Sequence, residues 1–199
     1  IYDVLKYFRF LLSLIIIISF TEEIKATHVP GGNITYENIG PNTFVVTLTV
    51  FEDCGTAFMG NTAQTVMVSN SCGLSSPNIN LPNVVFQDEV SQLCLQMIGQ
   101  SECNGGGFPG VYMHVWRDTI TLPGGCDSWV FAWDGCCRNN SVNSPGASNN
   151  YYWETVLNSV TAPSNSSPVI TSQPIPYNCN NQPVIYNFGV YEPDGDSLH

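Results

Sequence analysis

Basic residues are scarce in this 199-residue chain, which has five Lys and Arg against sixteen Asp and Glu and a formal net charge of −11. Lys6, Arg9 and Lys25 precede residue 27, so Arg117 and Arg138 alone carry positive charge beyond that point. Proteins that bind nucleic acid or anionic lipid present a basic patch, which this acidic sequence lacks. We therefore expect no nucleic-acid partner and no membrane surface partner.

The motifs of common enzymes and metal centres are also absent. There is no C-x-x-C, and His28, His114 and His199 are far apart, which disfavours zinc and thiol redox chemistry. Neither G-x-S-x-G nor H-E-x-x-H occurs. The carboxylate pairs at 52–53 and 88–89 are strand neighbours that point to opposite faces, so neither makes an acid/base pair by itself. The sequence predicts no catalytic residues, and His114 is expected to be a packed or surface side chain.

No long stretch spaces its apolar residues with the helical period of about 3.6 residues, whereas apolar and polar residues often alternate with a period of two. This pattern predicts an all-β fold. The clearest strand covers residues 43–53, with Phe44, Val46, Leu48 and Val50 on one face. Further strands are expected at residues 33–38, 64–70, 84–87, 93–98, 111–122 and 151–158.

The stretch 126–138, C-D-S-W-V-F-A-W-D-G-C-C-R, predicts a buried aromatic strand bracketed by cysteines. The turn residues Pro123-Gly124-Gly125 separate it from the strand at 111–122, so these two strands are expected to form a hairpin.

The first 26 residues resemble a signal peptide. Two basic residues precede an apolar run from residue 10 to residue 20, and Ala26 offers a cleavage site. A run of about eleven apolar residues is short for a bilayer span. We expect a secreted or cell-surface protein with no membrane contact after cleavage; an uncleaved signal anchor is the alternative.

Eight cysteines follow that leader, which indicates disulfides formed in an oxidising compartment. Spacing alone does not decide their pairing, although Cys94 and Cys103 flank a short loop and are predicted to be a local pair. Cys136 and Cys137, as neighbours, are predicted to reach two different partners. The cysteines expected in bridges are Cys54, Cys72, Cys94, Cys103, Cys126, Cys136, Cys137 and Cys179.

Composition divides the chain after the leader. Residues 27–160 are predicted to form a disulfide-stapled antiparallel β-sandwich, and the Ser/Pro/Asn-rich residues 161–168 a linker. Residues 169–199 are interpreted as the truncated start of an Ig/cadherin-like β domain.

Several motifs together resemble one family of secreted proteins. They are A-T-H-V-P-G-G-N-I-T-Y-E at residue 26, F-E-D-C-G at 51, V-S-Q-L-C at 90, C-N-G-G-G-F-P-G-V at 103, the stretch L-P-G-G-C-D-S-W-V-F-A-W-D-G-C-C-R-N at 122, N-S-S-P at 165 and E-P-D-G-D-S-L at 192. The set is similar to the N-terminal region of large multidomain surface proteins of Bacteroidota. Such proteins typically continue into Ig-like, cadherin-like or PKD repeats and end in a sorting domain for type IX secretion. Glu52 stands where that family usually has Arg, and Glu192 where it has Asp.

The turn Glu192-Pro193-Asp194-Gly195-Asp196 is the one candidate metal site. Calcium prefers several oxygen ligands on a flexible loop, and Glu192, Asp194 and Asp196 offer carboxylates across a Gly turn. The turn resembles the calcium-binding D-P-D-G-D turn of cadherin-like repeats. Calcium is the candidate cofactor, these residues would hold only part of its site, and a solvated acidic turn is the equal alternative.

The expected function is that of a non-catalytic, cell-surface structural module that contacts an extracellular protein or glycan in adhesion or matrix binding. The alternative is a carbohydrate-binding module that uses an exposed aromatic platform, with Trp116, Tyr152 and Trp153 as its candidate residues. Aromatic residues at strand spacing also fill sandwich cores, so the exposure of these rings distinguishes the two functions.

Overall fold

A computed structural model describes residues 29–55, 59–135, 150–175, 181 and 183–198 of the chain. The described part is nearly all β, as the alternation predicts, and its only helical elements are two short 3₁₀ turns, η1 (Ile98–Gln100) and η2 (Glu102–Asn104). None of the helices in these ranges is long and apolar enough to cross a bilayer.

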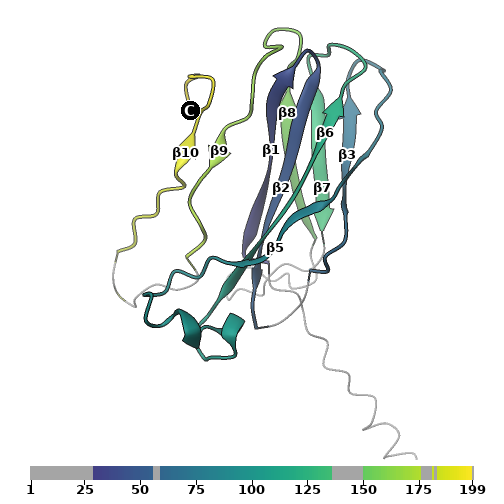
Figure 1. The fold of residues 1–199 in the computed structure, drawn as a ribbon. Helices are drawn as coiled ribbons and strands as arrows, with labels where there is room; N and C mark the ends of the chain where they lie inside the picture. Colours follow the sequence, from purple (N-terminus) through teal and green to yellow (C-terminus); the bar gives the residue numbers. More distant parts are fainter. Residues whose placement is uncertain (1–28, 56–58, 136–149, 176–180, 182, 199) are drawn as a thin grey trace, which may run out of the picture.

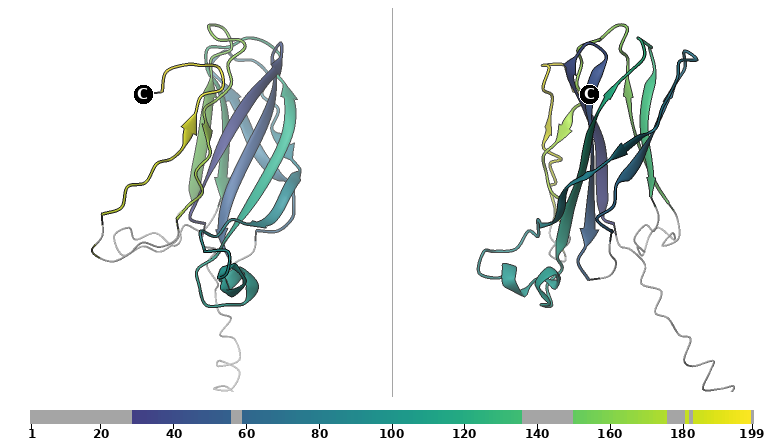
Figure 2. Two further views of the ribbon diagram at one scale, coloured as in Figure 1. Left: turned by 60° about the vertical axis from the view of Figure 1, so that its left-hand side comes forward. Right: turned by 45° about the vertical axis from the view of Figure 1, so that its right-hand side comes forward.

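Two four-stranded antiparallel sheets pack face to face as a sandwich (Figures 1 and 2). The first sheet has the order β1 (Gly31–Gly40), β2 (Thr43–Asp53), β6 (Val111–Thr121), β5 (Asn83–Glu89). The second has the order β4 (Ile79–Leu81), β3 (Gln64–Asn70), β7 (Trp129–Gly135), β8 (Tyr151–Leu157). A short pair, β9 (Val169–Ile170) and β10 (Val190–Tyr191), lies beside β1 (Figure 1).

The core lies between the sheets and follows from strand alternation. Phe44, Val46, Leu48 and Val50 of β2 are all fully buried, while the residues between them are half exposed. The facing strand β7 contributes Trp129, Phe131 and Trp133. Tyr36 of β1 connects the two layers, because its ring centroid lies 5.8 Å from that of Phe44 and 6.0 Å from that of Phe131.

The predicted hairpin between residues 111–122 and the aromatic strand is wrong. β6 pairs with β2 and β5 in one sheet, whereas β7 pairs with β3 and β8 in the other. Both strands carry bulky core side chains, and placing them in opposite sheets lets Trp116 and Trp129 fill one interior. The crossing segment is anchored at Cys126, whose N–H donates to Ser159 Oγ at 3.0 Å.

The predicted strand at residues 93–98 is also wrong. The chain there forms a turn and then η1, and Leu95 is 90% exposed. The short apolar run has no facing sheet to cover it, so propensity alone does not produce a strand.

Residues 166–167 follow the free edge of β1. Ser167 N–H donates to Tyr36 O at 2.8 Å, and Tyr36 N–H donates to Ser167 Oγ at 2.9 Å. Asn38 N–H donates to Ser166 Oγ at 3.3 Å. These bonds cover an edge strand that would otherwise expose its backbone groups, and they bring β9 and β10 over the outer face of the first sheet. The domain boundaries proposed from composition stay a prediction.

Candidate functional site

A hollow on the described surface lies between the outer face of the first sheet and the C-terminal segment. It has two parts, of about 380 Å³ and 550 Å³, which share Asn33 and Ile170. We call the two together the outer groove. Its floor comes from β1, β2 and β6, and its wall comes from residues 166–175, 184–188 and 193–194.

The larger part of the groove is polar. Its floor consists of two cross-strand rows on the outer face, Thr35–Thr47–Arg117 and Asn33–Thr49–Val115. Arg117 Nε donates to Thr47 Oγ1 at 3.0 Å, which orients the guanidinium along the floor. No carboxylate within the described ranges forms an ion pair with Arg117. Its terminal amino groups are therefore available to a ligand.

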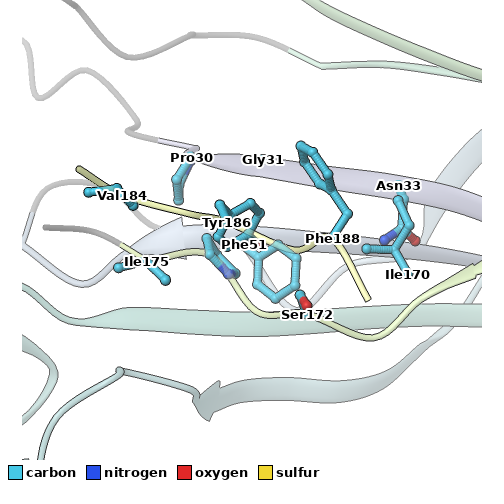
Figure 3. Close-up of a pocket in the computed structure, with 12 residues that line it drawn as sticks. Pro30, Gly31, Asn33, Phe51, Ile170, Ser172, Ile175, Val184, Tyr186 and Phe188 are labelled. Carbon is cyan, nitrogen blue, oxygen red and sulfur yellow. The ribbon is translucent and has the colours of Figure 1, made fainter. Parts of the chain in front are cut away.

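The smaller part of the groove is apolar and aromatic (Figure 3). Phe51 of β2 rises from the floor, and Tyr186 and Phe188 approach from the C-terminal segment. The rings of Tyr186 and Phe188 meet edge to face with centroids 5.0 Å apart, and Tyr186 O–H donates to Gln173 O at 3.0 Å. Phe188 is 62% exposed, so an aromatic face is open to solvent beside the polar floor.

The acidic turn lies at one end of this groove. Glu192 Oε2 accepts the N–H of Asp194 at 2.9 Å, and Asp194 Oδ2 accepts the N–H of Ser166. Burial raises the pKa of the Tyr36 hydroxyl, and the carboxylates of Asp194 and Glu192 raise it further against a hydrogen bond with Asn165. The turn is thus held by Asp194 to Ser166, and Ser166 Oγ in turn accepts the N–H of Asn38 on β1.

The three predicted calcium ligands, Glu192, Asp194 and Asp196, do not converge on one point. Within the part of the chain that the structure describes, three potential ligand side chains meet only at Cys72, Cys126 and Asp127, and these two cysteines form a disulfide. Calcium binding at the acidic turn stays a prediction.

The aromatic candidates do not share one surface. Trp116 is fully buried, donates its indole N–H to Thr62 O at 2.8 Å, and stacks on His114. Trp153 points inward and stacks on Trp133 with centroids 5.1 Å apart.

Tyr152 is 59% exposed and points to the other side of β8, because strand neighbours face opposite ways. Its hydroxyl donates to Glu154 Oε2 at 2.8 Å, which raises the pKa of the tyrosine. Trp116, Tyr152 and Trp153 therefore do not form a flat platform.

Four cysteines form two bridges, Cys54–Cys103 and Cys72–Cys126. The predicted Cys94–Cys103 pair is wrong, and Cys94 has an exposed free thiol. Cys54 N–H donates to Gly110 O at 3.0 Å, which holds the end of β2 beside the glycine-rich loop and gives Cys103 a partner distant in sequence. Cys136, Cys137 and Cys179 lie outside the described residues, as does the predicted signal peptide.

A buried polar pair that the sequence analysis missed lies inside the sandwich. His114 Nε2 is 2.8 Å from Glu52 Oε2, and the two side chains are 0% and 1% exposed. Glu52 Oε1 also accepts the N–H of Met59 at 2.7 Å. The signal was present, because Glu52 continues the inward register of Leu48 and Val50 and so requires a partner. With Phe86, Tyr112 and Trp116 around the imidazole, the pair is an enclosed structural contact.

Comparison with family models, curated proteins and solved structures found no match to this chain. The resemblance to Bacteroidota surface proteins therefore stays a prediction.

Proposed function

We propose that this chain is a non-catalytic extracellular module that binds a matrix protein or glycan, as part of a larger cell-surface protein. The observation that carries the proposal is the pair of disulfides in a β-sandwich. Cys54–Cys103 ties the end of β2 to the loop at η2, and Cys72–Cys126 ties the segment after β3 to the segment before β7. Such bridges persist in an oxidising compartment, which is compatible with an extracellular protein.

The two disulfides suit an adhesion module because they keep its solvent-exposed binding surface rigid. Both bridges close loops of about fifty residues, with separations of 49 and 54, and so restrict the unfolded chain strongly. The outer groove presents hydrogen-bonding, charged and apolar side chains that are suited to binding, and the buried pair Glu52 and His114 lies apart from it inside the sandwich.

A plate-binding assay tests this function. Wells are coated separately with cellulose, chitin, alginate, collagen and fibronectin, and the oxidised chain is titrated over each coat. We expect saturable binding to at least one coat, and loss of that binding after reduction and alkylation, because the bridges hold the surface. Absence of saturable binding on every coat, or release of soluble sugar or peptide from a coat, would contradict the proposal.

A further inference from the structure

We infer that the outer groove is a binding site for an acidic oligosaccharide, whose carboxylate pairs with Arg117 and whose sugar rings extend onto Phe51 and Phe188. The inference rests on the proposed function and specifies its ligand class. The ligand would lie away from Trp116, Tyr152 and Trp153. Its site is formed by two cross-strand rows on the outer face of the first sheet and by the C-terminal segment.

The positive charge of Arg117 indicates that the ligand carries an anionic group at this end of the groove. Arg117 is the only Lys or Arg in the described ranges, and its guanidinium faces the groove with one hydrogen bond, to Thr47. A guanidinium binds a carboxylate through two parallel N–H donors, and such charge-assisted bonds are stronger than neutral ones.

The acidic side chains of the same groove require hydroxyl groups on the ligand. Glu37 and Asp194 line the polar part, and a carboxylate accepts hydrogen bonds but donates none. A polyanion such as a nucleotide would meet repulsion from both. A sugar acid offers one carboxylate for Arg117 and several O–H donors for these acceptors.

The groove floor favours a carbohydrate over a fatty acid or an apolar peptide. Asn33 and Thr49 lie in the row between Phe51 and the row of Arg117, and they present an amide and a hydroxyl to the groove. An alkyl chain across this floor would desolvate those groups without replacing their hydrogen bonds to water. Pyranose rings, which carry hydroxyls on their edges and C–H groups on their faces, match both the polar rows and the exposed ring of Phe188. The two hollows have volumes typical of small-molecule sites, about 300–1,000 Å³.

Calorimetric titration of the oxidised chain with two defined tetrasaccharides tests the inference. The acidic probe is galactotetraose with a single galacturonate as its non-reducing terminal residue (the monouronate), and unmodified galactotetraose is its neutral counterpart. We expect the monouronate to bind at least tenfold more tightly than galactotetraose.

Two groove variants separate the parts of the site. Arg117→Gln should weaken binding of the monouronate about tenfold or more, because it removes a charge-assisted contact, and should leave galactotetraose nearly unchanged. Phe188→Ala should weaken both probes by several-fold, because both stack on that ring. Asn80→Asp on β4 in the other sheet is the matched control, since it lowers the net charge by one as Arg117→Gln does and should have little effect.

Several results would overturn the inference. The first two are equal affinity for the two probes and unchanged affinity in Arg117→Gln. The third is a loss of affinity in Asn80→Asp as large as that in Arg117→Gln. The fourth is binding of dodecanoate or an apolar hexapeptide in place of either sugar. If these occur while the chain still binds a coated well saturably, the groove assignment fails and the adhesion function stands. If well binding is also absent, both fail.

Discussion

The double substitution Cys72→Ala/Cys126→Ala is expected to lower the free energy of unfolding by about 4 kcal/mol. The bridge joins residues 54 apart, and opening a loop of this length restores much entropy to the unfolded chain. Cys126 is fully buried beside Trp129, so the bridge also fixes the chain where it crosses between the sheets. Urea denaturation followed by tryptophan fluorescence measures the change.

Cys94→Ala is the matched control for that experiment, because Cys94 is an exposed free thiol. Its free energy of unfolding should stay within about 0.5 kcal/mol of the parent chain. A double variant that unfolds at the same urea concentration as the parent would show that the bridge does not staple the sandwich.

The substitution Glu52→Ala is expected to cost about 3 kcal/mol of unfolding free energy, because it leaves buried hydrogen-bonding groups without their partner. It removes the carboxylate that lies 2.8 Å from His114 Nε2 and that accepts the N–H of Met59, and the His114 side chain is fully buried. The same urea denaturation measures it, with Glu154→Ala as a control at an exposed carboxylate on β8.

A double-mutant cycle shows whether the loss belongs to the pair. Glu52→Leu/His114→Phe replaces both partners by apolar side chains and should be more stable than Glu52→Leu alone, since no buried imidazole is left without its partner. Additive losses from the two single substitutions would show that Glu52 and His114 contribute independently.

Strand alternation predicts much of the fold from the sequence. The predicted strands at residues 43–53 and 64–70 match β2 and β3, and the inward face of β2 is the buried one. Long strands with one buried face carry this pattern because each successive residue changes sides. The aromatic stretch containing Trp129 and Trp133 was likewise identified as a buried strand, β7.

Strand partners and contacts distant in sequence were harder to predict. The turn before Cys126 is compatible with a hairpin as well as with a crossing between sheets, and the two are distinguished only by the strand partners of β6 and β7, which are distant in sequence. Cys103 and Cys94 are close in sequence, yet Cys54 is the residue that the sheet brings beside Cys103. The outer groove combines β1, β2 and β6 with the C-terminal segment, so no local motif indicates it.

The sharpest test of the disulfide-stapled sandwich is disulfide mapping of the chain, produced in an oxidising compartment, by non-reducing proteolysis and mass spectrometry. The structure predicts linked peptides for Cys54–Cys103 and Cys72–Cys126 and an unlinked peptide for Cys94. A Cys94–Cys103 linkage, or reduced thiols at Cys54, Cys72, Cys103 and Cys126, would contradict this account.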